Sequence, residues 1–419
     1  MMKILEMPPY YLPEQIASTH LTCDLTEKFV ERGWIIENIV PTPCRGVSEE
    51  TRKKYSKIRY EEMYSGNVQI NRFPIWKEGR NPIGRALRYF IANIIQGIKG
   101  CRAKDVDVVI GGSTPPIQGL MCGFVAKRLS KKTGKKIPFI YFLQDVFPDS
   151  LVNAGMARKG DLLWKIGRIV ENNIYNKADK IIVISNSIKR NIMEKGVPEE
   201  KIEVISNWID LDSVHPVDRK DNTLISEFGL DPSKFIVVYA GNFGAVQGAD
   251  IVLKAAKELE GNKDIQFVIF GGGPYFEAAK KEAEGLENVF IHELMPQDRI
   301  SEVYSLGDVA LITCKAGTGK AGMPSKTWSI MACNTPIIAS FDTDSDLAEI
   351  IQITQGGKCV EPDNYNILAN SILEEYSKDK RGNDLRTYVI KNASKDICTE
   401  RYAHILESIC PCSISVTER

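Results

Sequence analysis

Two lysines lie in and just after a glycine-bearing loop in the second half of the chain. Lys320 is inside the loop, and Lys326 follows Pro324 at the start of a helix predicted over residues 325–333. The glycines of the loop are Gly317, Gly319 and Gly322. Backbone N–H groups and the helix dipole favour a phosphate group at such a helix start, and two ammonium groups add to that preference. The segment therefore predicts a phosphate site, although an ordinary strand-to-helix turn with surface lysines fits it equally well.

Two buried strands are expected on either side of this loop and helix. Residues 309–313 form an apolar run before the loop, and residues 337–339 form another after the helix. Pro324 fits the first helical position, because the N–H group that proline lacks has no partner there anyway. The order strand, loop, helix, strand is that of a parallel sheet.

Strand-like runs elsewhere in the second half also end in glycine turns. One run covers residues 235–241 and leads into a loop that contains Asn242 and Gly244. Another covers residues 266–270 and is followed by the sequence GGGP, residues 271–274. In doubly wound sheets, ligands bind outside the carboxyl ends of the strands. These turns are therefore candidate contacts for a ligand.

Polar residues occupy comparable places in the first half. Ser18 and Thr19 start a helix predicted to run to Arg32, and Asp145 follows a strand predicted over residues 138–143. Both places face the ligand side of a doubly wound sheet. An N-cap for Thr19 and a loop-capping role for Asp145 are the alternatives.

A basic amphipathic helix is predicted after Pro82. Its apolar side chains cover one face: Ile83, Leu87, Phe90, Ile91, Ile94, Ile95 and Ile98. Arg85 and Arg88 lie off that face, and Trp76 precedes the helix. Such a helix can lie on an anionic membrane surface, but most amphipathic helices pack on a sheet.

Charge is divided unevenly along a chain whose formal net charge is zero. Residues 1–190 contain 31 Lys and Arg and 18 Asp and Glu, whereas the remainder contains 23 and 36. The basic front half predicts an anionic partner. Ten cysteines without a CxxC pair fit a reducing compartment. With no signal-peptide core and no membrane-spanning run in the sequence, we expect a cytoplasmic protein, either soluble or peripheral to a membrane.

The alternation of strands and helices on both sides of a polar segment predicts two domains. We expect an α/β protein with two Rossmann-like, doubly wound domains that face each other across a cleft. The predicted boundaries are 1–205 for an N-terminal domain, 206–234 for a linker and 235–395 for a C-terminal domain. A helix within 396–419 is expected to pack back on the N-terminal domain.

Several common signatures are missing from the sequence. It has no GxGxxG after the first strand of either half and no GxxxxGK[ST], HExxH or GxSxG. The acidic run at residues 342–346 could hold a divalent ion, or it could cap a helix that starts near Leu347. No strand face interleaves aromatic and basic residues, so we expect no nucleic-acid partner.

Motifs spread over nearly the whole chain resemble glycosyltransferase family 4, whose enzymes have the GT-B fold. The motifs are VISNWID at residues 204–210, GGGP at 271–274 and the run that ends in SIMACNTPIIAS at 340. Three others resemble variants of the WbuB-type subgroup, which transfers amino sugars in O-antigen and capsule synthesis. They are QDVFPDS at 144–150, GNFGAVQG at 241–248 and GKAGMPSKTWSIMA at 319–332.

The resemblance implies a site for a UDP-sugar in the second domain and no obligatory metal. The implied donor contacts are Gly241, Asn242, Gly244, Gly272, Gly273, His292, Leu294, Lys320, Ala321, Pro324, Ser325 and Ser329. Lys326, with the Gly241–Gly244 backbone, would stabilise the charge on the leaving diphosphate. Asp145 is the second candidate catalytic residue. The acceptor would contact Ser18, Thr19, Arg85 and Arg88.

The chain also departs from the usual pattern of the family. Ala321 and Ser329 stand where two glutamates are usual, and Asn242 and Gln247 stand where an Arg and a Lys are usual. Lys326, and then Lys320, are positioned to replace the missing cations. Gln144 and Asp145 occupy the place of a common histidine.

The implied reaction is retaining transfer of an N-acetylated or 6-deoxy amino sugar from a UDP-sugar. The implied acceptor is a polyprenyl-pyrophosphate-linked saccharide, which would bring the enzyme into peripheral contact with the anionic inner leaflet of the cell membrane. Two other hypotheses remain: a GT-B UDP-sugar 2-epimerase and a degenerate nucleotide-binding scaffold.

Overall fold

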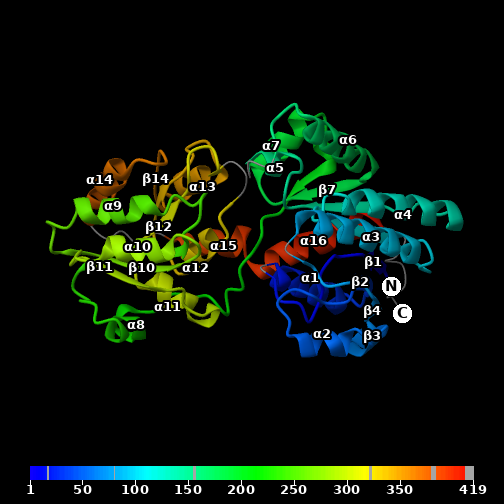
Figure 1. Cartoon of the computed structure of the whole chain (residues 1–419), viewed down its shortest axis with the longest axis horizontal. Coiled ribbons are helices and arrows are strands. Elements are labelled where there is room, and N and C mark those ends of the chain that lie inside the picture. The colour runs from blue at the N-terminus through cyan, green and yellow to red at the C-terminus, as the bar shows by residue number, and fades with distance from the viewer. Residues whose placement is uncertain (17, 80, 154–156, 320–322, 379–383, 411–419) are drawn as a thin grey trace. The chain divides into compact units, whose positions relative to one another are not determined.

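The computed structural model describes residues 1–16, 18–79, 81–153, 157–319, 323–378 and 384–410 (Figure 1). The chain divides into two compact units. Unit 1 comprises residues 1–206 and the chain from Cys398 onward, and unit 2 comprises residues 207–397. Each unit is an α/β domain built on a mainly parallel sheet, which confirms the predicted fold class.

Unit 1 contains an eight-stranded sheet within its described residues, in the order β3-β4-β2-β1-β5-β6-β7-β8. The strands are β1 (Lys3–Glu6), β2 (Ile35–Pro41), β3 (Tyr60–Met63), β4 (Val68–Phe73), β5 (Val108–Gly112), β6 (Phe139–Leu143), β7 (Lys180–Val183) and β8 (Ile202–Val204). Only β3 is antiparallel to its neighbour. The strand order reverses between β1 and β5, which makes this edge of the sheet a switch point.

The helices of unit 1 cover both faces of its sheet. They are α1 (Thr19–Glu31), α2 (Glu49–Tyr55), α3 (Pro82–Gly100), α4 (Gln118–Thr133), α5 (Asp149–Asn153), α6 (Leu162–Lys177), α7 (Asn186–Glu194) and, from Cys398, α16 (Lys395–Ile409). Apolar residues of α3, α4 and α6 share one core cluster with Leu5, Val109 and Phe139 of the sheet, so these three helices form a layer on one face.

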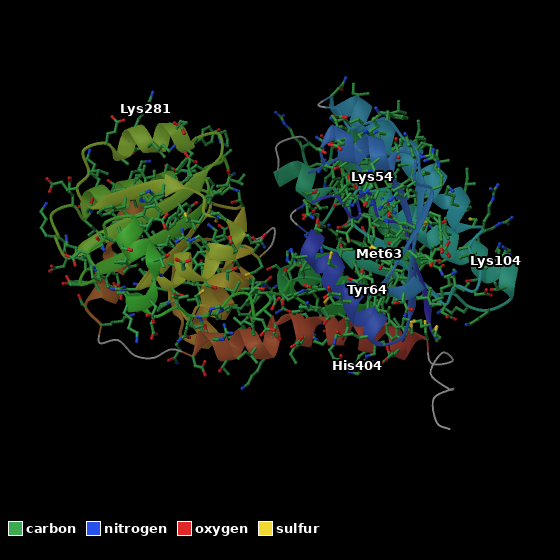
Figure 2. All side chains as sticks on the ribbon, turned by 90° about the horizontal axis from the view of Figure 1, so that it is seen from below. Lys54, Met63, Tyr64, Lys104, Lys281 and His404 are labelled. Atoms are coloured by element: carbon green, nitrogen blue, oxygen red, sulfur yellow. The ribbon has the colours of Figure 1, made fainter. Side chains whose placement is uncertain are left out.

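Helix α16 packs against α1 and the sheet of unit 1. Arg32, next to the end of α1, forms ion pairs with Glu400 and Glu407. The ring of Tyr402 lies 4.8 Å from that of Phe142 on β6. His404, on the opposite side of the helix, is exposed (Figure 2). The helix therefore buries one face on unit 1 and leaves the other to solvent.

Unit 2 has a six-stranded parallel sheet within its described residues, in the order β11-β10-β9-β12-β13-β14. The strands are β9 (Phe235–Asn242), β10 (Ile265–Gly272), β11 (Val289–Glu293), β12 (Val309–Thr313), β13 (Ile337–Ser340) and β14 (Gly357–Val360). The helices are α8 (Thr223–Glu227), α9 (Asp250–Glu258), α10 (Phe276–Ala283), α11 (Ile300–Ser305), α12 (Lys326–Ala332), α13 (Asp346–Thr354), α14 (Tyr365–Tyr376) and α15 (Leu385–Asn392).

The central strands of unit 2 are apolar over most of their length because both faces of the sheet are covered. On β9, Ile236 and Val238 belong to one core cluster, and Val237 and Tyr239 belong to the cluster on the other face. Helices on both faces of a parallel sheet produce this continuous apolar pattern.

The predicted linker, residues 206–234, is instead a structured part of unit 2. Val214, Leu224 and Leu230 are at most 6% exposed and lie in its core. Arg219 pairs with Asp308, and Asn222 bonds to the Glu302 carbonyl. The segment is polar in composition, yet its few apolar side chains are enough to fix it to the domain.

Candidate functional site

A cavity of about 540 Å³ opens at the carboxyl edge of the unit 2 sheet. It lies where the strand order reverses between β9 and β12, the place where ligands of doubly wound sheets bind. The loops after β9 and β12 line it with Gly241, Asn242, Val246, Gln247, Thr313, Cys314 and Thr318. The segment before and into α12 adds Met323, Pro324, Ser325 and Lys326, and an apolar wall is formed by residues that include Phe270, Leu294, Met295, Ile300, Val303, Tyr304 and Ile312.

Lys326, the first residue of α12, brings a positive charge to this cavity. Its ammonium nitrogen lies 4.5 Å from the centroid of the Tyr239 ring. The residue is half-buried, and desolvation of the amine by the surrounding protein lowers the pKa of Lys326 to about 8. Among the described residues, no carboxylate forms an ion pair with this amine. A buried amine that faces a cavity without a counter-ion is suited to bind an anionic ligand.

Gly241 makes room for the Lys326 amine. A Cβ atom on Gly241 would lie 2.6 Å from Nζ of Lys326 and 3.2 Å from the Tyr239 hydroxyl. Burial raises the pKa of Tyr239 to about 12, so the tyrosine stays neutral and offers its ring and hydroxyl rather than a charge. The end of β9 thus holds the amine between a bare backbone and an aromatic face.

Hydrogen bonds fix the loop that lines the opposite wall of the cavity. Asp342 accepts from the N–H groups of Gly317 and Gly319, at 2.9 and 2.8 Å. The Thr313 hydroxyl donates to the Gln247 carbonyl at 2.7 Å and so joins the loops after β12 and β9. Asp342 therefore holds a loop, and α13 is capped by Ser345, not by the aspartates of residues 342–346.

The structure brings five of the predicted donor contacts to the cavity wall, together with the candidate catalytic residue Lys326. The five are Gly241, Asn242, Leu294, Pro324 and Ser325. Lys320 and Ala321 lie outside the described residues. Helix α12 starts at Lys326, so Pro324 precedes the helix and does not occupy its first turn.

The glycine turns after β9 and β10 lie against each other behind the wall. Gly273 has a φ angle of 102°, and a Cβ there would lie 1.9 Å from Oδ1 of Asn242. Gly244 approaches the side chains of Asn242 and Gln247, and the Gly272 carbonyl accepts from the N–H of Phe243 at 2.7 Å. Gly244, Gly272 and Gly273 thus support Asn242 and are not themselves among the lining residues.

His292 is packed behind the wall of the cavity. Its ring stacks on Phe228 with centroids 3.8 Å apart, and burial lowers the pKa of His292, which favours the neutral imidazole. Its Nε2 is buried and has no hydrogen-bond partner among the described residues. Ser329 is 7% exposed and also lies behind the wall. The predicted contacts of both residues with the donor stay predictions.

Predicted acceptor residues of unit 1 lie at the carboxyl edge of its sheet or near it. The Thr19 hydroxyl accepts from the Ile16 N–H at 2.8 Å and donates to the Glu14 carbonyl, while Ser18 makes no capping bond. Asp145 has an exposed side chain just after β6, and its N–H bonds to the Ser113 hydroxyl at 3.1 Å. Thr19 thus orders its loop, and Asp145 is free to contact a ligand.

Arg88 does not have the place that the sequence predicted for it. It was expected off the apolar face and available to an acceptor, but it is 1% exposed. Its Nε donates to the Trp76 carbonyl at 3.0 Å, and its Nη2 lies 3.2 Å from the Cys44 sulfur. Arg88 is buried, where it supports two loops, and so it adds no charge to the outward face of α3. That face is apolar. Arg85 is partly exposed and pairs with Glu78 at 2.8 Å.

Sequence reasoning missed Tyr239 and a group of side chains around Glu78 in unit 1. Tyr239 lies in an apolar run whose pattern marks it as a core residue, but its contacts with Lys326 and with the Asn242 carbonyl connect it to the cavity. Glu78 accepts hydrogen bonds from Arg45, Tyr10 and Tyr89 and forms an ion pair with Arg85. These residues come from four separate segments, so no local motif could have identified them.

Both halves of the chain match glycosyltransferase families. Residues 20–213 match the family described as Glycosyltransferase Family 4, and residues 221–396 match the one described as Glycosyl transferases group 1. The first match falls in unit 1 with a short extension, and the second falls within unit 2. Each of the two units is therefore similar to a glycosyltransferase domain.

Two bacterial proteins with related sequences are named as glycosyltransferases. The probable glycosyltransferase WbjE of Pseudomonas aeruginosa is 29% identical over 306 residues, 72% of this chain and 74% of that protein. The putative colanic acid biosynthesis glycosyl transferase WcaI of Escherichia coli K12 is 24% identical over 404 residues, 94% of this chain and 97% of that protein.

Solved GT-B structures share the fold over nearly the full length. The sucrose-phosphate synthase of Thermosynechococcus elongatus matches with a TM-score of 0.73 at 15% identity and covers 98% of this chain and 100% of that one. HepE of Anabaena, solved with UDP and glucose, matches with a TM-score of 0.67 at 14% identity, over 97% of this chain and 100% of that one. At these identities the similarity establishes the fold.

Two searches of the described residues gave no candidates. No helix in that part of the chain is both long and apolar enough to cross a bilayer. Likewise, no cluster of three or more His, Cys, Asp or Glu residues suited to a metal ion occurs there.

Proposed function

We propose that the protein transfers a sugar from a UDP-sugar to a polyprenyl-diphosphate-linked saccharide in the synthesis of a bacterial surface polysaccharide. The observation that carries the proposal is the Lys326 amine, which faces the cavity of unit 2 with no counter-ion among the described residues. The complex of HepE with UDP and the name of the relative WcaI support the donor and the pathway class.

In this proposal the diphosphate of the donor binds beside Lys326. Its charge increases when the bond to the sugar breaks, so an ammonium group fixed at that place stabilises the leaving group. The bare backbone at Gly241 lets the diphosphate approach the amine. The apolar wall around Leu294 and Met295 suits the flat face of a nucleobase.

Three further parts of the proposal rest on the family resemblance. They are retention of configuration, the absence of an obligatory metal and the transfer of an N-acetylated or 6-deoxy amino sugar. Asp145 is proposed as an acceptor-side carboxylate, because it is exposed after β6 at the ligand edge of unit 1. Ser18 and Thr19 start α1 near the same edge.

Peripheral attachment to the cytoplasmic face of an anionic membrane is proposed from the outer surface of α3, α4 and α6. Side chains on this surface are between 38% and 79% exposed although they are large and apolar: Ile83, Leu87, Phe90, Ile94, Ile98, Phe124, Leu162, Leu163, Ile166 and Ile169. Exposed lysines and arginines on α4 lie among them: Lys127, Arg128, Lys131 and Lys132. Apolar side chains next to cationic ones suit the interface of an anionic bilayer.

The donor site can be tested by titration calorimetry of UDP, GDP and ADP with the full chain and with Lys326→Ala. We expect selective binding of UDP and a loss of roughly tenfold or more in the variant, which corresponds to about 1.4 kcal/mol. Failure of all three nucleotides to bind the unaltered chain would overturn the donor site. Release of UDP from a UDP-sugar only when a membrane acceptor is added would then distinguish a transferase from an epimerase or a scaffold.

A further inference from the structure

A cluster of arginines and tyrosines surrounds Glu78 at the carboxyl edge of the unit 1 sheet. Arg45 follows β2, Glu78 follows β4, Tyr10 follows β1, and Arg85 and Tyr89 lie on the first two turns of α3. These segments converge beside the switch point of the sheet, where ligands of doubly wound domains bind.

Glu78 holds two guanidinium groups in fixed positions. Its two oxygens accept from Arg45 Nη2 at 2.6 Å and Arg45 Nε at 2.9 Å, a bidentate pair, and Arg85 Nε forms an ion pair with the same carboxylate at 2.8 Å. The hydroxyls of Tyr10 and Tyr89 donate to the same carboxylate at 2.8 and 3.0 Å. The Arg45 guanidinium also lies 4.6 Å from the centroid of the Tyr10 ring. A network of this kind orients both arginines before a ligand arrives.

The cluster is more positive than its own carboxylates can balance. The side chain of Glu78 is 8% exposed and fully engaged, whereas those of Arg45 and Arg85 are 39% and 42% exposed. Below them lies Arg88, which is buried and whose Nη1 has no hydrogen-bond partner among the described residues. The other buried carboxylate, Glu14, accepts from the backbone N–H groups of Cys44 and Arg45. Three guanidinium groups therefore meet two carboxylates, which favours an additional anion at the exposed side.

An apolar surface begins at the same turn of α3. Ile83 and Leu87, on either side of Arg85 in sequence, are 79% and 53% exposed, and the stripe continues through Phe90 to Ile98. A free phosphate ion would gain nothing from such a stripe, but an amphiphile with an anionic head and a hydrocarbon chain would contact both parts.

We propose that Arg45 and Arg85, aligned by Glu78, bind the diphosphate of a polyprenyl lipid whose hydrocarbon chain runs along the exposed stripe of α3. The inference rests on the proposed function and identifies the residues that would hold its acceptor. Both guanidinium groups belong to partly exposed side chains, which are 39% and 42% exposed for Arg45 and Arg85. Two guanidinium groups side by side match the oxygens of a diphosphate in number and geometry.

The test is a titration of farnesyl diphosphate, below its micellar concentration, into the full chain saturated with UDP. Saturation keeps the probe out of the unit 2 cavity, and a repeat in Lys326→Ala excludes that cavity independently. We expect Arg45→Gln and Arg85→Gln each to weaken binding at least tenfold. Arg102→Gln, an exposed arginine of unit 1 outside the cluster, should bind as the unaltered chain does.

Two further probes separate the parts of the lipid. Inorganic pyrophosphate should bind at least tenfold more weakly than farnesyl diphosphate, and farnesol should lose the dependence on the two arginines. Equal affinity for pyrophosphate and farnesyl diphosphate would overturn the lipid assignment, and unchanged affinity in both arginine variants would overturn the site.

Failure of this inference can be distinguished from failure of the donor site. Binding of UDP with no binding of farnesyl diphosphate would reject this inference alone, and the reverse would reject the donor site alone. The Arg85→Gln variant should fold normally, because Arg85 is partly exposed on a helix surface and its replacement leaves the Arg45–Glu78 pair in place. A loss of binding in this variant can therefore be assigned to the site. A thermal unfolding curve matched to that of the unaltered chain is required of each variant.

Discussion

The ammonium group of Lys326 lies 4.5 Å from the centroid of the Tyr239 ring, in the wall of a cavity and without a carboxylate partner in the described chain. The two residues come from different elements, since Lys326 is the first residue of α12 and Tyr239 lies within β9. Their contact means that the cation is held by an aromatic face and a bare backbone, neither of which neutralises it. Such a cation remains available to an incoming diphosphate.

Affinity for UDP should fall as the pH rises through 8. Burial lowers the pKa of Lys326 to about 8 in the free protein, and a bound diphosphate would favour the charged amine and raise that pKa again. If only the protonated amine binds the diphosphate, the affinity decreases about tenfold between pH 7 and pH 9, with proton uptake near pH 8. Calorimetry in buffers of different ionisation enthalpy measures both quantities. Lys326→Arg is the control and should show no such pH dependence; equal affinity of the unaltered chain at pH 7 and 9 would contradict the prediction.

Gly241→Ala should weaken UDP binding while the domain stays folded. The new Cβ would lie 2.6 Å from Nζ of Lys326, the end of a flexible side chain that can move away at little cost. Displacement of the amine removes a charge-assisted contact, and we expect a loss of about tenfold in affinity. The matched control is Gly261→Ala in the same unit, where a Cβ would meet nothing within 4 Å. If Gly241→Ala binds UDP as tightly as the unaltered chain does, the Lys326 amine is not part of the UDP site.

The repeated strands and helices of the two domains could be predicted from the sequence because burial on both faces of the sheet leaves an unmistakable apolar run. Strand β12 was predicted over the residues that it occupies. The turns after β9 and β10 could be identified because their glycines are local signals.

The arrangement of side chains that meet from distant segments could not be predicted in the same way. Arg88 reads as a polar surface residue of α3, and only the carbonyl of Trp76 and the sulfur of Cys44, supplied by other loops, make its burial favourable. The segment at residues 206–234 has the composition of a linker, and its burial depends on a core cluster in which Leu224 is joined by residues as distant in sequence as Val303 and Leu306.

Glu78→Gln should make unit 1 less sensitive to acid. Although burial alone would raise the pKa of Glu78, hydrogen bonds from Arg45, Tyr10 and Tyr89 lower it to about 2. Because the folded pKa lies below the usual value of about 4.3, the carboxylate contributes stability above pH 4.3 and loses it as the pH falls toward 2, by up to about 3 kcal/mol. Urea unfolding curves of unit 1 between pH 7 and pH 2.5 measure this slope.

The glutamine variant should be less stable at pH 7 but should show a shallower loss of stability below pH 4. Glu50→Gln, an exposed carboxylate on α2, is the control and should keep the slope of the unaltered chain. An identical acid slope in Glu78→Gln and in the unaltered chain would mean that the network around Glu78 does not stabilise the fold.

Loss of exposed aliphatic side chains from α3 and α6 should release the protein from anionic vesicles. Phe90 on α3 and Ile166 on α6 are 53% and 51% exposed, on helices that both pack against α4 in one layer. Transfer of each side chain to the bilayer interface contributes roughly 1–2 kcal/mol, so Phe90→Gln combined with Ile166→Gln should reduce partitioning at least tenfold. Co-sedimentation with vesicles of phosphatidylglycerol and phosphatidylcholine is the measurement.

The matched control places the same two changes on unit 2, at Tyr275 and Ile353, which are 54% and 62% exposed. Partitioning of that variant should equal that of the unaltered chain. Because Lys127, Arg128, Lys131 and Lys132 on α4 add electrostatic attraction, binding should weaken with added salt and with pure phosphatidylcholine vesicles. Strong binding that persists after the changes on α3 and α6 would place the membrane contact elsewhere on the chain. If the unaltered chain does not bind the vesicles, the proposed membrane contact is wrong.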